Sequence, residues 1–109
     1  MTDRETIAFR MVLNSGMAEE YRRRHDEIWP DLLVALREAG VVDYRIFLDP
    51  GTHHLFAVLT RRRESHRMAA LRDAPVMRRW WAMMADIMQT NEDASPREVP
   101  LAEMFCLNF

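Results

Sequence analysis

The 109-residue sequence predicts an α+β fold in which helices cover one face of an antiparallel β-sheet. Apolar and polar residues alternate with period two near both ends and in the middle of the chain, a pattern typical of half-buried strands. Between these stretches the apolar residues recur with the period of amphipathic helices. The predicted order is strand, two helices, two strands, two helices and strand, which is the split βαβ order of a ferredoxin-like sandwich. We expect residues 1–109 to form a single domain.

The first half of the sequence predicts one strand and two helices. Residues 6–14 alternate, and the apolar face of this strand carries Ile7, Phe9, Met11 and Leu13. After a turn at residues 14–16, a helix starts near Met17 and has to end or bend near Trp29, because Pro30 disfavours helical geometry in its predecessor. Pro30 suits the first turn of a second helix, which Gly40 closes.

The second half predicts a β-hairpin, two more helices and a last strand. Residues 41–49 and 54–60 form the hairpin around the turn Asp49-Pro50-Gly51-Thr52. In its first strand one face carries Val42, Tyr44, Ile46 and Leu48, and Phe47 lies on the other. Residues 64–71 predict a short helix, and a longer one starts at 74–75 with a wide apolar face that extends to Met88. Residues 101–109 alternate weakly and predict the last strand.

The composition excludes several classes of function. All fifteen basic residues are Arg, so Schiff-base catalysis and a Walker-type phosphate loop lack their lysine. A net charge of -2 argues against a nucleic-acid partner, and acidic neighbours of the two Arg triplets indicate ion-paired surface instead. No apolar stretch approaches the ~20 residues that span a bilayer. The lone Cys106 fits a reducing compartment, so we expect a cytoplasmic protein.

No metal site is expected from the spacing of possible ligands. His53 and His54 are adjacent in a predicted strand, where neighbouring side chains face opposite ways, and His66 lies at the polar start of a helix. The run of methionines from Met77 to Met88 suits core packing better than a copper site.

Three ring-bearing residues of the first helix have helical spacing. Tyr21, His25 and Trp29 stand at i, i+4 and i+8 and would share one face if the helix reached that far. Two interpretations stay open on spacing alone. The stripe is either the partly buried face of an ordinary amphipathic helix, or a site where the imidazole moves protons and the rings hold a small polar ligand.

A second aromatic group comes from Trp80, Trp81 and Tyr44. Adjacent helical residues point about 100° apart, so one indole can fill the core while the other walls an adjoining cavity. In a ferredoxin-like fold the first helix, the second strand and the long helix can converge on one side of the sheet. Indoles and phenols around a pocket suit a sugar, although tryptophans that simply fill a small core would give the same pattern.

The sequence resembles the L-rhamnose mutarotase family along nearly its whole length. The matching segments in the first half are Glu20-Tyr21-x-x-Arg24-His25-Asp26-x-Ile28-Trp29-Pro30, Tyr44-x-Ile46-x-Leu48-Asp49 and Leu55-Phe56-Ala57. Those in the second half are Arg79-Trp80-Trp81, Met84-x-Asp86-Ile87-Met88, Ser95-Pro96 and Glu103-Met104-Phe105. The combination of His-x-x-x-Trp-Pro with Trp-Trp is more specific than either element alone.

The resemblance implies a homodimeric α/β barrel that interconverts the α and β anomers of L-rhamnose without a cofactor. Position by position, His25 matches the proton donor of the family, and the sugar-contacting residues match Tyr21, Tyr44, Trp80 and Trp81. Cys106 departs from the family pattern at a predicted strand end. L-fucose or another 6-deoxy sugar is an alternative substrate, and a non-catalytic sugar-binding protein or a cofactor-free oxygenase on the same barrel is an alternative function.

Anomer exchange needs two proton carriers. Ring opening gives a proton to the ring oxygen while the anomeric hydroxyl loses one, and closure on the other face reverses both transfers. A histidine can serve in either direction near neutral pH. For the second carrier the sequence leaves Tyr21, Tyr44, a bound water and Asp86 as candidates.

Overall fold

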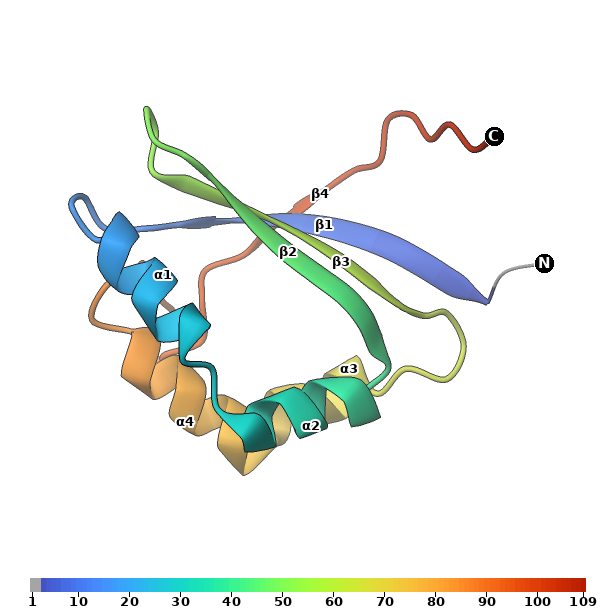
Figure 1. Ribbon diagram of the computed structural model, residues 1–109, viewed down its shortest axis with the longest axis horizontal. Helices are drawn as coiled ribbons and strands as arrows, with labels where there is room; N and C mark the ends of the chain where they lie inside the picture. The colour runs from blue at the N-terminus through green and yellow to red at the C-terminus, as the bar shows by residue number, and fades with distance from the viewer. Residues whose placement is uncertain (1–2) are drawn as a thin grey trace.

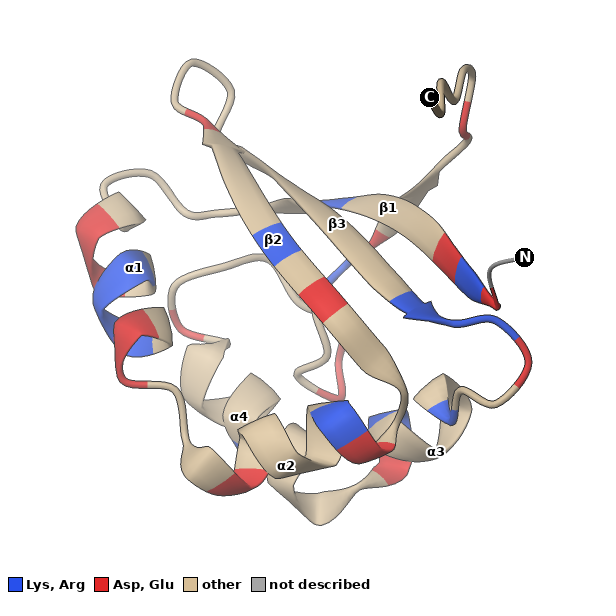
Figure 2. Cartoon of the chain, turned by 45° about the vertical axis from the view of Figure 1, so that its right-hand side comes forward, with Lys and Arg blue, Asp and Glu red and all other residues tan. Residues whose placement is uncertain are grey.

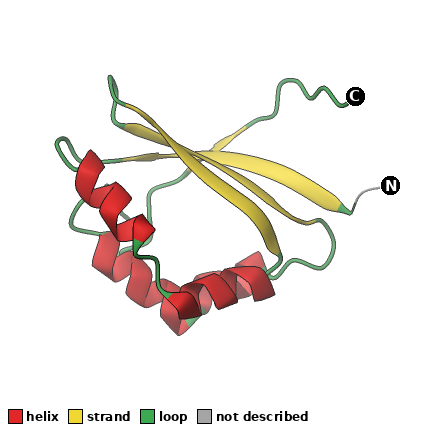
Figure 3. Cartoon of the chain, viewed as in Figure 1, coloured by secondary structure: helices red, strands yellow, loops and turns green. Residues whose placement is uncertain are grey.

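The computed structural model describes residues 3–109 and has two layers, with a sheet on one side and the helices on the other (Figure 1, Figure 3). The elements in chain order are β1 (Arg4–Val12), α1 (Ala18–Asp26), α2 (Pro30–Glu38), β2 (Val41–Asp49), β3 (His54–Arg62), α3 (Met68–Asp73), α4 (Pro75–Met84) and β4 (Val99–Leu101). This is the predicted ferredoxin-like α+β order, so the fold class is confirmed.

The sheet is antiparallel throughout and has the strand order β2-β3-β1-β4. The central pair, β1 and β3, runs in unbroken register from Arg4 opposite Arg62 to Val12 opposite His54. On the helix side of β3, the residues Leu55, Ala57 and Leu59 are buried. The edge strand β2 is much more exposed, because only β3 pairs with it. This edge position leaves the inner face of β2 free to line a cavity.

Prolines start two of the helices on the inner side of the sheet. Pro30 begins α2 and Pro75 begins α4, and the preceding residues, Trp29 and Ala74, both have extended backbones with ψ of 134°. Proline imposes this conformation on its predecessor and fits the first helical turn, where no backbone donor is needed. The predicted break at Pro30 is therefore confirmed.

Gly40 ends the second helix segment, as predicted, in a conformation that favours glycine. Its φ is +103°, and a Cβ built on it would lie 3.0 Å from the Cα of His66. Both the backbone angle and the close approach of the chain after β3 therefore require the absence of a side chain.

Several element boundaries differ from the sequence-based expectation. The helix expected to reach Trp29 ends at Asp26, so Trp29 does not continue the stripe of Tyr21 and His25. The strand predicted over residues 6–14 is shifted to begin at Arg4, and the helix predicted over 64–71 is shifted to Met68–Asp73. The long helix ends at Met84, but Met88 beyond it is still buried, because it forms a β-bridge with Leu13.

The prediction of a strand over residues 101–109 is wrong for this chain. Strand β4 stops at Leu101, and residues 102–109 pair with no strand of the described chain 3–109. In Figure 1 this tail, which ends in red, runs away from the sheet. Its alternating apolar residues are exposed; Met104 and Phe105, for example, are 90% and 78% exposed. The strand pattern is thus present in the sequence, but no edge of this chain is used to complete it.

Candidate functional site

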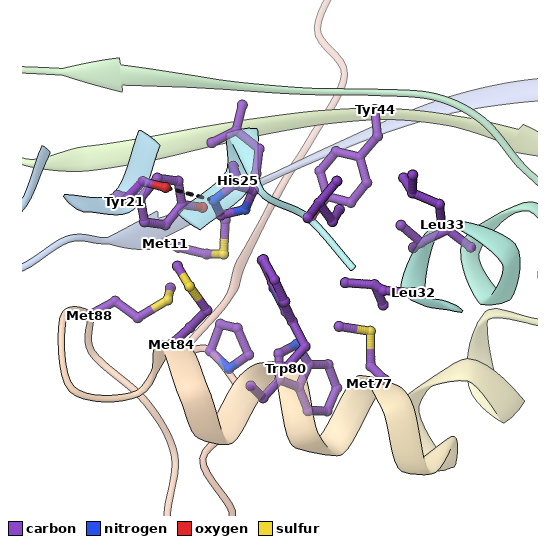
Figure 4. A pocket seen from close by; sticks show the side chains of 15 residues that line it. Met11, Tyr21, His25, Leu32, Leu33, Tyr44, Met77, Trp80, Met84 and Met88 are labelled. Atoms are coloured by element: carbon purple, nitrogen blue, oxygen red, sulfur yellow. Dashed lines mark hydrogen bonds between the residues drawn. The ribbon is translucent and has the colours of Figure 1, made fainter. Parts of the chain in front are cut away.

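A cavity of about 300 Å³ lies between the sheet and the helices (Figure 4). Five ring-bearing side chains line it, from α1, β2 and α4: Tyr21, His25, Tyr44, Trp80 and Trp81. These are the five site residues predicted from the sequence, and the fold brings all of them to one cavity. The remaining lining is apolar: Met11, Ile28, Leu32, Leu33, Leu36, Ile46, Met77, Met84, Met88 and Pro96.

The imidazole of His25 is held between two aromatic side chains. Tyr21 and His25 share a face of α1 because they are one turn apart, and their rings stack with centroids 4.3 Å apart and planes inclined by 27°. On the other side the indole of Trp80, from α4, meets the imidazole edge to face at 5.3 Å. The imidazole plane is therefore fixed by contacts with two helices.

A hydrogen bond fixes which nitrogen of His25 is available for proton transfer. The Nδ1 atom lies 3.0 Å from the backbone oxygen of Tyr21. A carbonyl oxygen can only accept, so neutral His25 donates from Nδ1 and its Nε2 carries the free lone pair. Burial lowers the pKa of His25 below its ordinary value, although the contact with the Tyr21 carbonyl works in the opposite direction. The imidazole is thus neutral near pH 7.

The two phenols of the cavity keep their protons at neutral pH. Burial raises the pKa of Tyr21 and also that of Tyr44, where the charges of neighbouring acidic groups add to the effect. Although 38% of Tyr44 is exposed on the edge strand, its ring points from β2 into the cavity (Figure 4). Phe9 of β1 packs against that ring edge to face at 6.4 Å. Both hydroxyls can therefore donate hydrogen bonds to a bound ligand.

Both tryptophans of α4 line the cavity, whereas the sequence suggested one in the core and one on a cavity wall. Trp80 and Trp81 are 6% and 8% exposed, so each is a core residue and a wall residue at once. The guanidinium groups of Arg72 and Arg78 lie 5.1 and 5.5 Å from the centre of the Trp81 ring and hold it by cation–π contacts.

Trp29 has a different role from Tyr21 and His25. Among the described residues 3–109, it is not part of the cavity lining. Its indole packs edge to face against that of Trp80, with centroids 5.2 Å apart. Trp29 therefore supports a cavity residue from behind, at the bend before Pro30.

Asp86 does not reach the reacting region. It lies outside the lining within the described chain, its side chain is 67% exposed, and its carboxylate pairs with Arg24. Of the candidates for the second proton carrier, the structure brings Tyr21 and Tyr44 to the cavity and leaves Asp86 at its outside.

The apolar part of the lining was not predicted from the sequence as part of the site. Met11 of β1 and Leu32 of α2 belong to it, and the signal that could have marked them is that β1 and α2 directly precede and follow α1, the helix of His25. Within residues 3–109, no group of three or more His, Cys, Asp or Glu side chains is placed to hold a metal ion. No helix in the same range is long and apolar enough to cross a membrane.

Comparisons with known proteins point to one family. The profile of L-rhamnose mutarotase matches residues 6–107 of this chain. The L-rhamnose mutarotase of Burkholderia ambifaria is 62% identical over 94% of this chain and 98% of its own. The crystal structure of the L-rhamnose mutarotase from Formosa agariphila superposes with a TM-score of 0.86 at 41% identity and covers 95% of this chain and 99% of its own.

More distant structures share the fold alone. A protein from Nitrosomonas europaea named as an antibiotic biosynthesis monooxygenase superposes with a TM-score of 0.61 over 96% of this chain and 94% of its own, at only 11% identity. The ferredoxin-like frame is thus common to proteins with different chemistry, and the sequence match decides between them. The chain belongs to the L-rhamnose mutarotase family.

Proposed function

We propose that the cavity between α1, β2 and α4 binds the pyranose ring of L-rhamnose and that His25 carries protons to and from its anomeric oxygen. As a member of this family, the chain is a carbohydrate isomerase that interconverts the α and β anomers of L-rhamnose. The observation that supports the site assignment is the neutral imidazole of His25, anchored at Nδ1 and held between Tyr21 and Trp80 in a cavity.

The cavity has the size and surface that a 6-deoxy sugar requires. About 300 Å³ is at the lower end of the ~300–1,000 Å³ that small-molecule sites occupy. Ring faces of Trp80 and Trp81 suit the C–H faces of a pyranose, and the hydroxyls of Tyr21 and Tyr44 suit its hydroxyl groups. A 6-deoxy sugar also carries a methyl group, for which the methionine and leucine side chains of the lining provide an apolar environment.

In the proposed reaction His25 acts first as a base. Its Nε2 takes the proton of the anomeric hydroxyl while a second group gives a proton to the ring oxygen, and the ring opens to the aldehyde. Rotation about the bond between C1 and C2 presents the other carbonyl face. The ring hydroxyl attacks it, the imidazolium returns its proton to the new anomeric oxygen, and the second group recovers its own. A positioned base of this kind contributes a rate factor of roughly 10²–10⁴.

The test is saturation-transfer NMR across a panel of 6-deoxy sugars, because this method measures the rate at which the protein exchanges each pair of anomers. We expect faster exchange of L-rhamnose anomers than of L-fucose anomers. The variant H25N should keep the fold and sugar binding but lose most of the exchange. Exchange at the wild-type rate in H25N would show that His25 does not carry the protons. If the protein exchanged the anomers of no sugar in the panel, L-rhamnose would not be its substrate.

The same variant separates the alternative functions. A non-catalytic sugar-binding protein would bind L-rhamnose without accelerating exchange, in H25N and wild type alike. A cofactor-free oxygenase would consume dioxygen with a suitable substrate, but the neighbours with such names resemble this chain only in fold. Family membership therefore favours the isomerase.

We further propose that two copies associate through the open face of the sheet and form a dimeric α/β barrel. The face of the sheet that points away from the helices carries charged residues such as Arg10, Asp43 and Arg45 and also a group of apolar side chains: Ala8, Val12, Phe47, Phe56, Val58, Val99 and Leu101. In the cartoon of Figure 2, β2 carries a basic and an acidic segment in its middle, whereas most of β3 is uncharged. Within this group the side chains of Phe47, Val99 and Leu101 are exposed, and Phe47 is 56% exposed. Exposed apolar patches of this kind mark interfaces between proteins.

Two further features support association through this face. The Nε atom of Arg10, on the same side of β1, is buried without a hydrogen-bond partner within residues 3–109, and a second copy can supply the acceptor. The tail of residues 102–109 has the alternation of a strand and exposed apolar side chains, and a neighbouring sheet can pair with it.

Light scattering coupled to size-exclusion chromatography tests the dimer. We expect a mass of twice 12.9 kDa over a wide range of concentrations. The variant F47D should dissociate it, whereas V34D, at a similarly exposed apolar residue on α2, should not. A 12.9 kDa species at every concentration would contradict the proposal.

The cytoplasmic location also stays a proposal, supported by the exposed thiol of Cys106, which forms no disulfide.

A further inference from the structure

The helix that carries His25 is weakly buried. None of the nine residues of α1, Ala18–Asp26, is fully buried, and the helix has no side-chain N-cap. Its inward side chains, Tyr21 and His25, are those that face the cavity. A proton carrier has to be held in a defined geometry, since a displacement of 1 Å can cost about a hundredfold in rate. Contacts other than core packing therefore have to fix α1 against α4, which carries Trp80.

Arg24 supplies such contacts across the two helices. Its Nη1 donates to the backbone oxygen of Met83 at 2.8 Å and to Asp86 Oδ1 at 2.8 Å, and its Nη2 donates to Asp86 Oδ2 at 3.2 Å. Its Nε donates to Glu20 Oε2 at 2.7 Å within α1. All three guanidinium nitrogens are thus bonded, and the planar group is held in one orientation.

The position of this contact relates it to the reacting group. Arg24 directly precedes His25, and Met83 lies within one turn of Trp80 on α4, so the Arg24 contacts lie close to the edge-to-face contact between His25 and Trp80. Met83 is in the last turn of α4, where backbone carbonyls lack helical donors and attract a cation. The guanidinium therefore attaches α1 to the C-terminal end of α4, the helix whose Trp80 contacts the imidazole.

We propose that Arg24 and Asp86 are positioning residues of the anomer-exchange site, which hold the imidazole of His25 at a fixed place relative to Trp80 and the cavity. This inference rests on the proposed role of His25. It assigns to Asp86 a function other than proton transfer, in agreement with its pairing to Arg24 outside the lining of the cavity within the described chain.

The neighbouring Arg23 shows what an ordinary surface arginine looks like on the same helix. Its side chain is 57% exposed and pairs only with Glu20 and Glu27 of the same segment, among the contacts of residues 3–109. The side chain of Arg24 is 15% exposed and bridges two elements that are far apart in the sequence. Exposed pairs such as those of Arg23 contribute little to stability, because water and salt screen their charges. Arg23 is therefore a matched control.

The experiment compares R24M, R24K, D86N and R23M by saturation-transfer NMR at saturating and at limiting L-rhamnose, with the melting temperature of each variant. We expect R24M and D86N to lower the maximal exchange rate at least tenfold while the sugar affinity changes less than threefold. R24K should recover part of the rate, because its ammonium reaches one acceptor but lacks the fork. The double variant R24M/D86N should be no slower than R24M, since the pair between Arg24 and Asp86 is already absent in R24M.

Two results would overturn the proposal. One is an R24M rate within twofold of wild type. The other is a rate loss that R23M reproduces, or that only follows the loss of folded protein measured by melting. A third measurement separates this proposal from the proposed function: the ¹⁵N resonances of the His25 ring should shift in R24M and D86N and stay in place in R23M. That shift is expected even if L-rhamnose proves to be the wrong sugar, and its absence counts against the positioning role.

Discussion

The imidazole of His25 and the indole of Trp80 meet edge to face, with centroids 5.3 Å apart and planes inclined by 87°. These residues come from α1 and α4, between which α2, β2, β3 and α3 lie in the sequence, and both side chains line the cavity. Trp80 in turn rests on Trp29 at 5.2 Å. The row of rings from Tyr21 through His25 and Trp80 to Trp29 thus connects the imidazole to the core.

Replacement of Trp80 by Phe should weaken sugar binding. A smaller ring loses part of the stacking surface, and aromatic contacts of this type contribute about 0.5–1.5 kcal/mol, which corresponds to a loss of affinity of roughly twofold to thirteenfold. Titration followed by ¹H–¹⁵N spectra measures the affinity.

The matched control is W29F, because Trp29 touches Trp80 from outside the cavity lining of residues 3–109. It should lower the free energy of unfolding, as large-to-small core changes do, and leave sugar affinity within about twofold. Equal losses of affinity in W80F and W29F would show that Trp80 acts only through packing.

The pH dependence of exchange and of stability should follow His25. Burial lowers the pKa of His25 in the folded state below the ~6.5 of the unfolded chain, so the unfolded state binds more protons in the window between the two values. Stability is therefore highest above pH 6.5 and falls as the pH drops towards the folded-state pKa. Exchange should fall as the pH drops through the folded-state pKa itself, where Nε2 becomes protonated. Urea unfolding and exchange rates measured from pH 5 to 8 test both.

The variant H25N provides the control for this titration, since its side chain does not ionise. The part of the stability change that comes from His25 should disappear in it. If H25N retained the same slope between pH 5 and 6.5, other groups would account for the acid sensitivity.

Sequence patterns predicted the fold because local signals and topology agree. Period-two alternation in β1 and β3 and prolines at Pro30 and Pro75 are local features, and they set the element order. Local spacing grouped Tyr21 with His25 and marked Trp80 and Trp81 as a pair, and the fold brings these residues to one cavity. Their roles came from the resemblance to the family and stay predictions.

Features that depend on distant partners were not predictable in this way. The ion pair between Arg24 and Asp86 joins residues 62 positions apart, and only the packing of α1 on α4 brings them together. The end of α1 at Asp26 removed Trp29 from the stripe, and the missing partner strand left the tail after Leu101 without pairing in this chain.

Alanine substitutions at two glycines should separate backbone strain from steric conflict. Both have positive φ, +80° at Gly16 and +103° at Gly40, so both substitutions cost left-handed strain of roughly 1–2 kcal/mol. At Gly16 no described atom outside its immediate neighbours lies within 4 Å of the new Cβ, whereas at Gly40 it would meet the His66 backbone at 3.0 Å. G40A should therefore lose clearly more stability in urea unfolding than G16A. Equal losses would mean that the segment of His66 yields without cost.

The second proton carrier can be identified by removing one phenol oxygen at a time. Tyr21 and Tyr44 both line the cavity, and burial keeps both protonated, so either can give a hydrogen bond or a proton to the ring oxygen. Tyr21 stacks on His25, so its ring lies next to the imidazole on α1. Tyr44 enters the cavity from β2 instead.

Because the ring oxygen and the anomeric hydroxyl are different atoms of the sugar, a donor on the opposite side from His25 is better placed to serve the ring oxygen. We therefore expect Y44F to lower the maximal exchange rate at least tenfold, as the loss of an acid–base group does, and Y21F to lower it less while weakening affinity. Saturation transfer at saturating sugar measures the first quantity, and titration measures the second. A larger rate loss in Y21F than in Y44F would make Tyr21 the donor to the ring oxygen. Small losses in both variants would mean that a bound water gives this proton.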